Sequence, residues 1–160
     1  RPNLGFEVLD EFRRKKEFGE WAEESKFKAE IIKTGELILV RPQTFMNLSG
    51  EVVREILAFY KLDHANDLLV IHDEADLLFA SVKEAFASGS AGHNGVQNII
   101  DELGTKDFAR VRIGVESRAT RNDLPTDVFV LQKFTDEELE KLEKDIFPEA
   151  NKLIEAFIKS

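Results

Sequence analysis

The sequence predicts an α/β fold in which a mixed, largely parallel twisted sheet is flanked by helices. Helix-type and strand-type patterns alternate along most of the chain, with one hairpin pattern near the start. The continuous apolar run from Leu68 to Ile71 has the composition of a central strand that is covered on both faces. The chain has 160 residues, so we expect residues 1–160 to form a single domain.

The first part of the chain predicts two helices around a hairpin. A helix capped by Asn3 is expected because acidic residues precede basic ones along it, as the helix dipole favours. Strands at 27–32 and 37–40 are expected to form the hairpin, with Pro42 ending the second strand. A helix with Ser49 as its cap then follows from an apolar stripe, which consists of Val52, Val53, Ile56, Leu57 and Tyr60.

The middle of the chain predicts the strands of the main sheet. The central strand is expected to stop at the polar residues 72–76, which would then lie at its carboxyl end. A strand at 82–86 leads into a glycine-rich loop and then into a helix that Gly104 terminates. A further strand is expected at 108–115, where apolar and polar residues alternate.

The last part of the chain predicts an extended segment and a long helix. Residues 116–126 have the composition of a polar loop, and residues 127–131 that of a short strand or extended segment. Thr135 begins a capping box for the final helix, and Pro148 is expected to kink or split that helix.

Composition excludes several classes of protein. The formal net charge is −9, so the surface is not broadly basic and any contact with RNA is expected to be local. The sequence has no Cys, which excludes disulfides and thiol catalysis and favours the cytoplasm. Its apolar runs are far shorter than the ~20 residues of a membrane helix, so no membrane span is expected. The first residue is Arg1 rather than Met, and we expect that an upstream segment is missing.

Three polar segments fall where α/β sheets gather functional residues, at strand ends and helix starts. In one of them, His72 and the carboxylates that follow it could ligate a divalent metal. An acidic turn after a strand is common, however, and no second histidine has the spacing of a metal ligand, so a structural role is favoured. His93 is either a base or a hydrogen-bonding residue at a helix start, and its spacing favours the second role. The segments are 44–49, 72–76 and 89–95.

Other residues of these segments also have two interpretations. Asn47 and Asn94 stand at loop-to-helix junctions, where an asparagine cap needs no further function. Phe45 and Met46 either fill the core or form a platform on which a base or peptide stacks. The glycines of the loop at 89–95 could admit an anion at a helix start, although they match neither a Walker loop nor a clear dinucleotide motif.

Four strings, in this order and spacing, resemble the bacterial-type peptidyl-tRNA hydrolase family. They are RPQTFMNLSG at 41–50, HDEADL at 72–77, GSAGHNG at 89–95 and RVRIG at 110–114. Residues 3–10 also resemble the family's first helix, so the resemblance covers nearly the whole chain. It implies a hydrolase that cleaves the ester between a peptide and the 3′ end of tRNA, acts as a monomer and needs no metal or other cofactor.

The resemblance also implies catalytic residues. Asp73 matches the aspartate that orients a catalytic histidine, which serves as the general base. Asn47 and Asn94 match two asparagines that position the attacking water, the peptide carbonyl and the developing oxyanion.

Substrate-binding residues follow from the resemblance in the same way. Phe45 and Met46, together with Asn47 and Asn94, match residues that line the cleft for the tRNA end and the peptide. Lys83 and Arg112 match basic residues that the family carries near the tRNA phosphates, towards the acceptor stem.

The chain departs from the family at its start. The catalytic histidine of the family directly precedes the asparagine matched by Asn3, and Pro2 stands there in this chain. The family's opening strand would lie before Arg1. We therefore expect activity to be reduced or lost in this form. A non-catalytic RNA- or protein-binding module of the same fold is the alternative, and a small-molecule hydrolase using His72 and its neighbouring carboxylates is a third hypothesis.

Overall fold

The computed structural model describes residues 4–43, 48–90, 93–116 and 136–160. The chain divides into two compact units. Unit 1 consists of residues 1–12, 69–85 and 110–160, and unit 2 of residues 13–68 and 86–109. The first helix, α1 (Leu4–Lys16), contributes residues 4–12 to unit 1 and residues 13–16 to unit 2. The expectation of a single domain stays a prediction.

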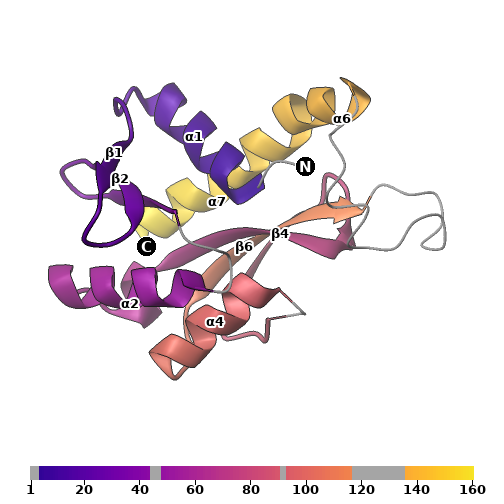
Figure 1. The fold of residues 1–160 in the computed structure, drawn as a ribbon. Coiled ribbons are helices and arrows are strands. Elements are labelled where there is room, and N and C mark those ends of the chain that lie inside the picture. The colour runs from indigo at the N-terminus through magenta and orange to yellow at the C-terminus, as the bar shows by residue number, and fades with distance from the viewer. Residues whose placement is uncertain (1–3, 44–47, 91–92, 117–135) are drawn as a thin grey trace. The chain divides into compact units, whose positions relative to one another are not determined.

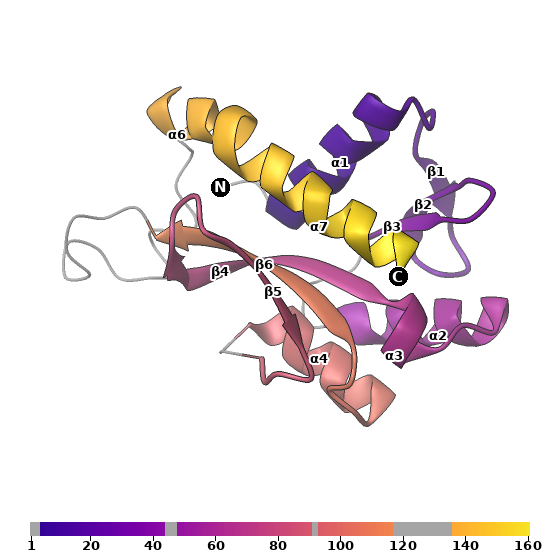
Figure 2. The same ribbon diagram turned by 180° about the vertical axis from the view of Figure 1, so that it is seen from behind.

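Unit 1 is built on a three-stranded sheet of mixed direction. Its strands are β4 (Leu69–Leu78), β5 (Val82–Phe86) and β6 (Ala109–Glu116), in the order β4-β6-β5. The arrows of β4 and β6 point the same way in both views (Figures 1 and 2). β5 runs antiparallel to β6, as the bond from Gly114 N to Ser81 O at 2.8 Å and the one from Ala87 N to Phe108 O at 3.4 Å indicate.

Helices cover one face of this sheet. α1 places Leu4, Val8 and Phe12 in the core at a spacing of four residues, so one stripe of the helix is buried. α7 (Phe147–Lys159) lies on the same side of the sheet as α1 (Figures 1 and 2). The Asn151 side chain on α7 donates to Glu11 Oε2 on α1 at 2.9 Å and links the two helices.

The end of the chain is helical from residue 136 to residue 159. α6 (Asp136–Lys141) continues into a π-helical segment (Leu142–Ile146) and then into α7. Pro148 stands in the first turn of α7, two residues after the π-helical segment ends. The expected kink or split at Pro148 thus appears as a π-helical segment that interrupts the α-helix just before α7. The extended segment expected at 127–131 and the cap at Thr135 lie outside the described residues.

Unit 2 contains a second, antiparallel sheet of three strands. They are β1 (Ala22–Glu24), β2 (Ala29–Lys33) and β3 (Ile38–Pro42), in the order β1-β2-β3. Thr34 and Leu37 exchange backbone hydrogen bonds at 2.9 and 3.3 Å across a two-residue turn. The hairpin is thus confirmed, and Pro42 ends its second strand as expected. β1 was not expected, because its three residues are exposed and lack a strand-like pattern.

Three helices complete unit 2. α2 (Ser49–Tyr60) packs its apolar stripe on the second sheet and also packs along α4 (Asn94–Leu103). α4 ends at Gly104, which has a φ of 71° and so takes the left-handed conformation expected of a terminating glycine. α3 (His64–Asp67) is a short helix capped by Asp63, whose side chain accepts from Ala65 N. The core between α2 and the sheet consists of Phe27, Ala29, Ile31, Val52 and Ile56.

The α/β class with helices flanking mixed sheets is confirmed, with two local corrections. β4 does not stop at His72 but continues to Leu78, because the polar residues there alternate between buried and less buried positions as a strand requires. Ser49 is the first residue of α2 rather than its cap. Among the described residues, no helix combines the length and the apolar character needed to cross a lipid bilayer.

Candidate functional site

The acidic segment at 72–76 lies within β4 of unit 1. His72 and Glu74 are buried, while Asp73 between them is partly exposed and points to the opposite face. His72 Nδ1 lies 3.0 Å from the carbonyl oxygen of Asp73, and since a carbonyl only accepts, this contact requires a proton on Nδ1. The alternation separates the Asp73 carboxylate from the other two side chains. Among the residues with described side chains, no three His, Cys, Asp or Glu form a metal-binding group.

Glu74 is bound from the neighbouring strand by Arg112. Arg112 Nε lies 3.1 Å from Glu74 Oε1, and Nη2 lies 2.5 Å from Oε2. The two side chains thus form a bidentate ion pair that joins β4 to β6. The Glu74 side chain is 3% exposed and that of Arg112 26%. These hydrogen bonds raise the pKa of Arg112 above its ordinary value. Because both oxygens of Glu74 are taken, its carboxylate is not placed to serve as a base or a metal ligand.

A second arginine is buried beside this pair. Arg110 lies two residues before Arg112 on the same strand and is 2% exposed. Burial lowers its pKa, the nearby charge of Arg112 lowers it further, and Glu74 acts in the opposite direction. The Glu74 carboxylate therefore stabilises two cationic groups of β6.

Lys83, the other basic residue expected near tRNA phosphates, stands on β5 of the same sheet. Its side chain is exposed and forms no ion pair within the described part of the chain. Lys83 and Arg112 thus belong to one sheet, but they differ in setting. The ammonium group of Lys83 faces solvent, whereas the charge of Arg112 is largely balanced by Glu74.

In unit 2, the start of α4 is formed by the glycine-rich segment. His93 is the N-cap of α4, and its Nδ1 accepts from Val96 N at 3.1 Å. This nitrogen must be unprotonated to accept, which supports the helix-start role favoured for His93. Asn94 is the first residue of α4, and its side chain lies outside what the structure describes.

The start of α2 is held by a residue that the sequence analysis did not single out. Gly50 N in the first turn of α2 donates to Oδ1 of Asn98, on α4, at 2.6 Å. Leu48, the residue before α2, occupies the N-cap position and makes no side-chain hydrogen bond to the helix. A polar residue in the middle of an amphipathic helix was the only sequence feature that could have pointed to Asn98.

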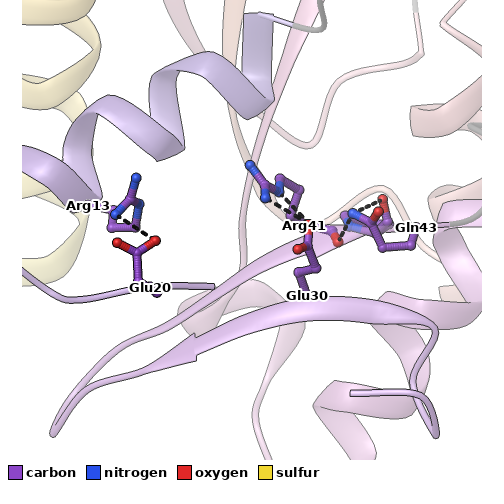
Figure 3. Close-up of polar contacts among 6 residues, drawn as sticks. Arg13, Glu20, Glu30, Arg41 and Gln43 are labelled. Atoms are coloured by element: carbon purple, nitrogen blue, oxygen red, sulfur yellow. Dashed lines mark hydrogen bonds and ion pairs between the residues drawn. The ribbon is translucent and has the colours of Figure 1, made fainter. Parts of the chain in front are cut away.

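The end of β3, before the segment 44–47, is held by two side chains (Figure 3). Arg41 donates from Nε and Nη2 to Glu30 Oε1 at 3.0 and 2.8 Å, and its guanidinium lies 4.4 Å from the centre of the Trp21 ring. The Gln43 side chain folds back and donates to the carbonyl oxygen of Arg41 at 3.0 Å. Gln43 N also donates to Lys28 O at 2.9 Å, so the strand is anchored at the point where the segment begins.

The remaining expected site residues lie outside the described part of the chain. Asp73, Lys83 and Arg112 belong to unit 1, and Asn94 opens a helix of unit 2. Whether all of these residues share one site stays a prediction. The residues not described are Pro2, Phe45, Met46 and Asn47.

Comparison with known proteins gives a uniform result. The sequence profile of the Peptidyl-tRNA hydrolase family matches residues 1–160. A peptidyl-tRNA hydrolase of Pelagibacter ubique is 40% identical over 149 residues, which cover 90% of this chain and 76% of that protein. One from Mycoplasma capricolum is 40% identical over 159 residues, which cover 98% of this chain and 83% of that protein.

Solved structures show the same fold. The crystal structure of peptidyl-tRNA hydrolase from Acinetobacter baumannii superposes with a TM-score of 0.81 and 23% sequence identity. The match covers 96% of this chain and 78% of that one.

Proposed function

The chain belongs to the peptidyl-tRNA hydrolase family, and from that premise we propose that Asp73, Asn47 and Asn94 form its catalytic site. The function of the family is to release the peptide from peptidyl-tRNA by hydrolysis of an ester. The observation that carries the function is the match over the whole chain, with relatives at 40% identity. No metal or other cofactor is part of the proposal.

Each proposed residue has a chemical role. Asp73 lies on β4 with its side chain on the face opposite His72 and Glu74, and a carboxylate there can orient a base. Asn94 opens α4, where backbone N–H groups and a side-chain amide can stabilise negative charge on a carbonyl oxygen. Asn47 is assigned to position the water or the peptide carbonyl.

Substrate contacts are proposed for four further residues. Phe45 and Met46 would contact the terminal base or the peptide, and Lys83 would contact phosphates of the acceptor stem. Arg112 would approach phosphates with its charge held in place by Glu74. We also propose that the chain acts as a monomer in the cytoplasm, where translation forms its substrate.

The second candidate function is a non-catalytic module that binds RNA or protein. One specific observation favours it, namely that Pro2 occupies the position matched to the catalytic histidine. A proline has no ionisable side chain, so Asp73 would have no base to orient at that position.

Hydrolysis of an N-blocked aminoacyl-tRNA tests both candidates. We expect the Pro2→His variant to release the amino acid about 10²–10⁴-fold faster than the parent chain, because a positioned general base contributes a factor of this size. The Pro2→His, Asp73→Asn double variant is the control and should fall back to the rate of the parent. If the parent turns over as fast as the variant, another residue is the base, whereas binding of tRNA without turnover by either chain supports the binding module.

A further inference from the structure

The N-terminus of α2 is capped from another helix. The first four N–H groups of a helix have no partner within it and are usually satisfied by a side chain at the N-cap. Leu48 cannot fill this role, and Ser49 is already helical. Asn98 Oδ1, from the second turn of α4, instead accepts from Gly50 N at 2.6 Å.

The contact leaves no room between the two helices. A Cβ on Gly50 would lie 2.4 Å from the backbone oxygen of Asn98 and 2.8 Å from its Oδ1. Only a glycine at position 50 therefore allows α2 to approach α4 closely enough for the hydrogen bond. One helical turn further along both helices, Arg54 Nη1 pairs with Glu102 Oε2 at 3.1 Å.

The two hydrogen-bonded residues are close in sequence to the proposed asparagines. Asn47 precedes Gly50 by three residues, and Asn94 precedes Asn98 by four, which is about one turn of an α-helix. Any change in the spacing or rotation of α2 against α4 therefore acts on the start of α2, which follows Asn47 in the sequence, and on the start of α4, where Asn94 stands.

We propose that Asn98 is a positioning residue of the hydrolase, which caps α2 from α4 and thereby holds the start of α2, two residues after Asn47 in the sequence, against α4, which Asn94 opens. This inference rests on the proposed function. The required property of residue 98 is an acceptor oxygen at the position of Oδ1. Aspartate supplies such an oxygen with nearly the same shape, and alanine does not.

Binding of a substrate analogue tests the inference without the need for turnover. The probe is 3′-(N-acetylaminoacyl)amino-3′-deoxyadenosine, which has the 3′ end of peptidyl-tRNA with an amide in place of the ester. Its Kd would be measured by calorimetry for the parent, Asn98→Ala and Asn98→Asp. The matched control is Gln97→Ala, because Gln97 is the adjacent exposed residue of α4 and its side chain donates a hydrogen bond to Asp101 on the same helix.

We expect Asn98→Ala to weaken binding about tenfold, which corresponds to the loss of one partly buried hydrogen bond that positions the site. The Kd of the analogue for Asn98→Asp and for Gln97→Ala should stay within about twofold of the Kd for the parent. Such a difference is too small for a lost hydrogen bond. Thermal melting of each variant shows whether it is folded at the temperature of the titration.

Two results would overturn the inference. A folded Asn98→Ala chain that melts earlier but binds the analogue as the parent does would give Asn98 a purely structural role. A loss of affinity in Asn98→Asp would contradict the need for an acceptor, and this variant decides the question if Asn98→Ala does not fold. If the parent itself does not bind the analogue, the proposed function fails and the inference falls with it, whereas the first two results leave the proposed function intact.

Discussion

In the described residues of each unit, an arginine–glutamate pair joins two neighbouring strands, and the two pairs differ in burial. Glu74 and Arg112 join β4 to β6 in unit 1, where the Glu74 side chain is 3% exposed. Glu30 and Arg41 join β2 to β3 in unit 2, with side chains 28% and 22% exposed. Water can replace Arg41 at Glu30 but has little access to Glu74. The two pairs therefore differ in the energy that each contributes, because the buried carboxylate has no alternative partner in solvent.

The surroundings of the two arginines increase the difference in stabilising energy between the two pairs. Arg112 has a second, buried cation beside it in Arg110, so Glu74 balances two charges. Arg41 instead rests on the face of Trp21, whose ring attracts a cation whether or not Glu30 is present. The pair in unit 1 thus depends on its carboxylate far more than the pair in unit 2 does.

Removal of the buried carboxylate should have the largest effect. We expect Glu74→Gln to lower the free energy of unfolding by about 3–5 kcal/mol, because two cationic groups of β6 lose the buried carboxylate that the structure places beside them on β4. Urea denaturation followed by circular dichroism measures this change. The control is Glu84→Gln on β5, an exposed residue that should change stability by less than about 0.5 kcal/mol. Equal effects of the two substitutions would contradict the importance of burial.

Removal of the Arg112 side chain should lower the free energy of unfolding by less than removal of the Glu74 carboxylate does. In Arg112→Leu, Glu74 keeps the positive charge of Arg110 nearby, so we expect a loss of about 1–3 kcal/mol in the same urea titration. The order of the two variants is the informative result. A loss in Arg112→Leu as large as that in Glu74→Gln would show that Arg110 does not compensate.

Loss of the Glu30–Arg41 pair in unit 2 should lower the free energy of unfolding least. We expect Glu30→Gln to lower the free energy of unfolding by about 1 kcal/mol or less, and the difference from the parent to shrink further at high salt. Glu23→Gln is the matched control, since Glu23 lies opposite Glu30 in the β1–β2 register and is exposed. A salt-independent loss above about 2 kcal/mol would mean that this pair behaves as a buried one.

Local signals in the sequence were sufficient for much of the fold. The hairpin of unit 2, the strand expected at 108–115 and the end of α4 at Gly104 were predicted from a turn, an alternating pattern and a glycine. The path of β4 was predicted only in its apolar half. His72 and Glu74 did not look like strand residues, because the partner that makes Glu74 a buried residue lies 38 residues away in the sequence.

The site was less accessible to sequence reasoning than the fold. Asp73, Asn47 and Asn94 stood out only through the family resemblance, since each also had an ordinary structural interpretation. The cap of α2 was assigned to Ser49, because capping is usually local. The actual acceptor, Asn98, is 48 residues from Gly50, and a contact of that range is set by the packing of two helices rather than by neighbouring residues.

The stacking of Arg41 on Trp21 also has a spectroscopic consequence. The chain contains one Trp and one Tyr, and both Trp21 and Tyr60 belong to unit 2. Tryptophan emission therefore reports on the β1–β3 region alone, and a guanidinium 4.4 Å from the ring should make it sensitive to loss of that contact. Far-ultraviolet circular dichroism reports on helices of both units. Recording the two signals in one titration would show whether unit 1 and unit 2 lose their structure together or in succession.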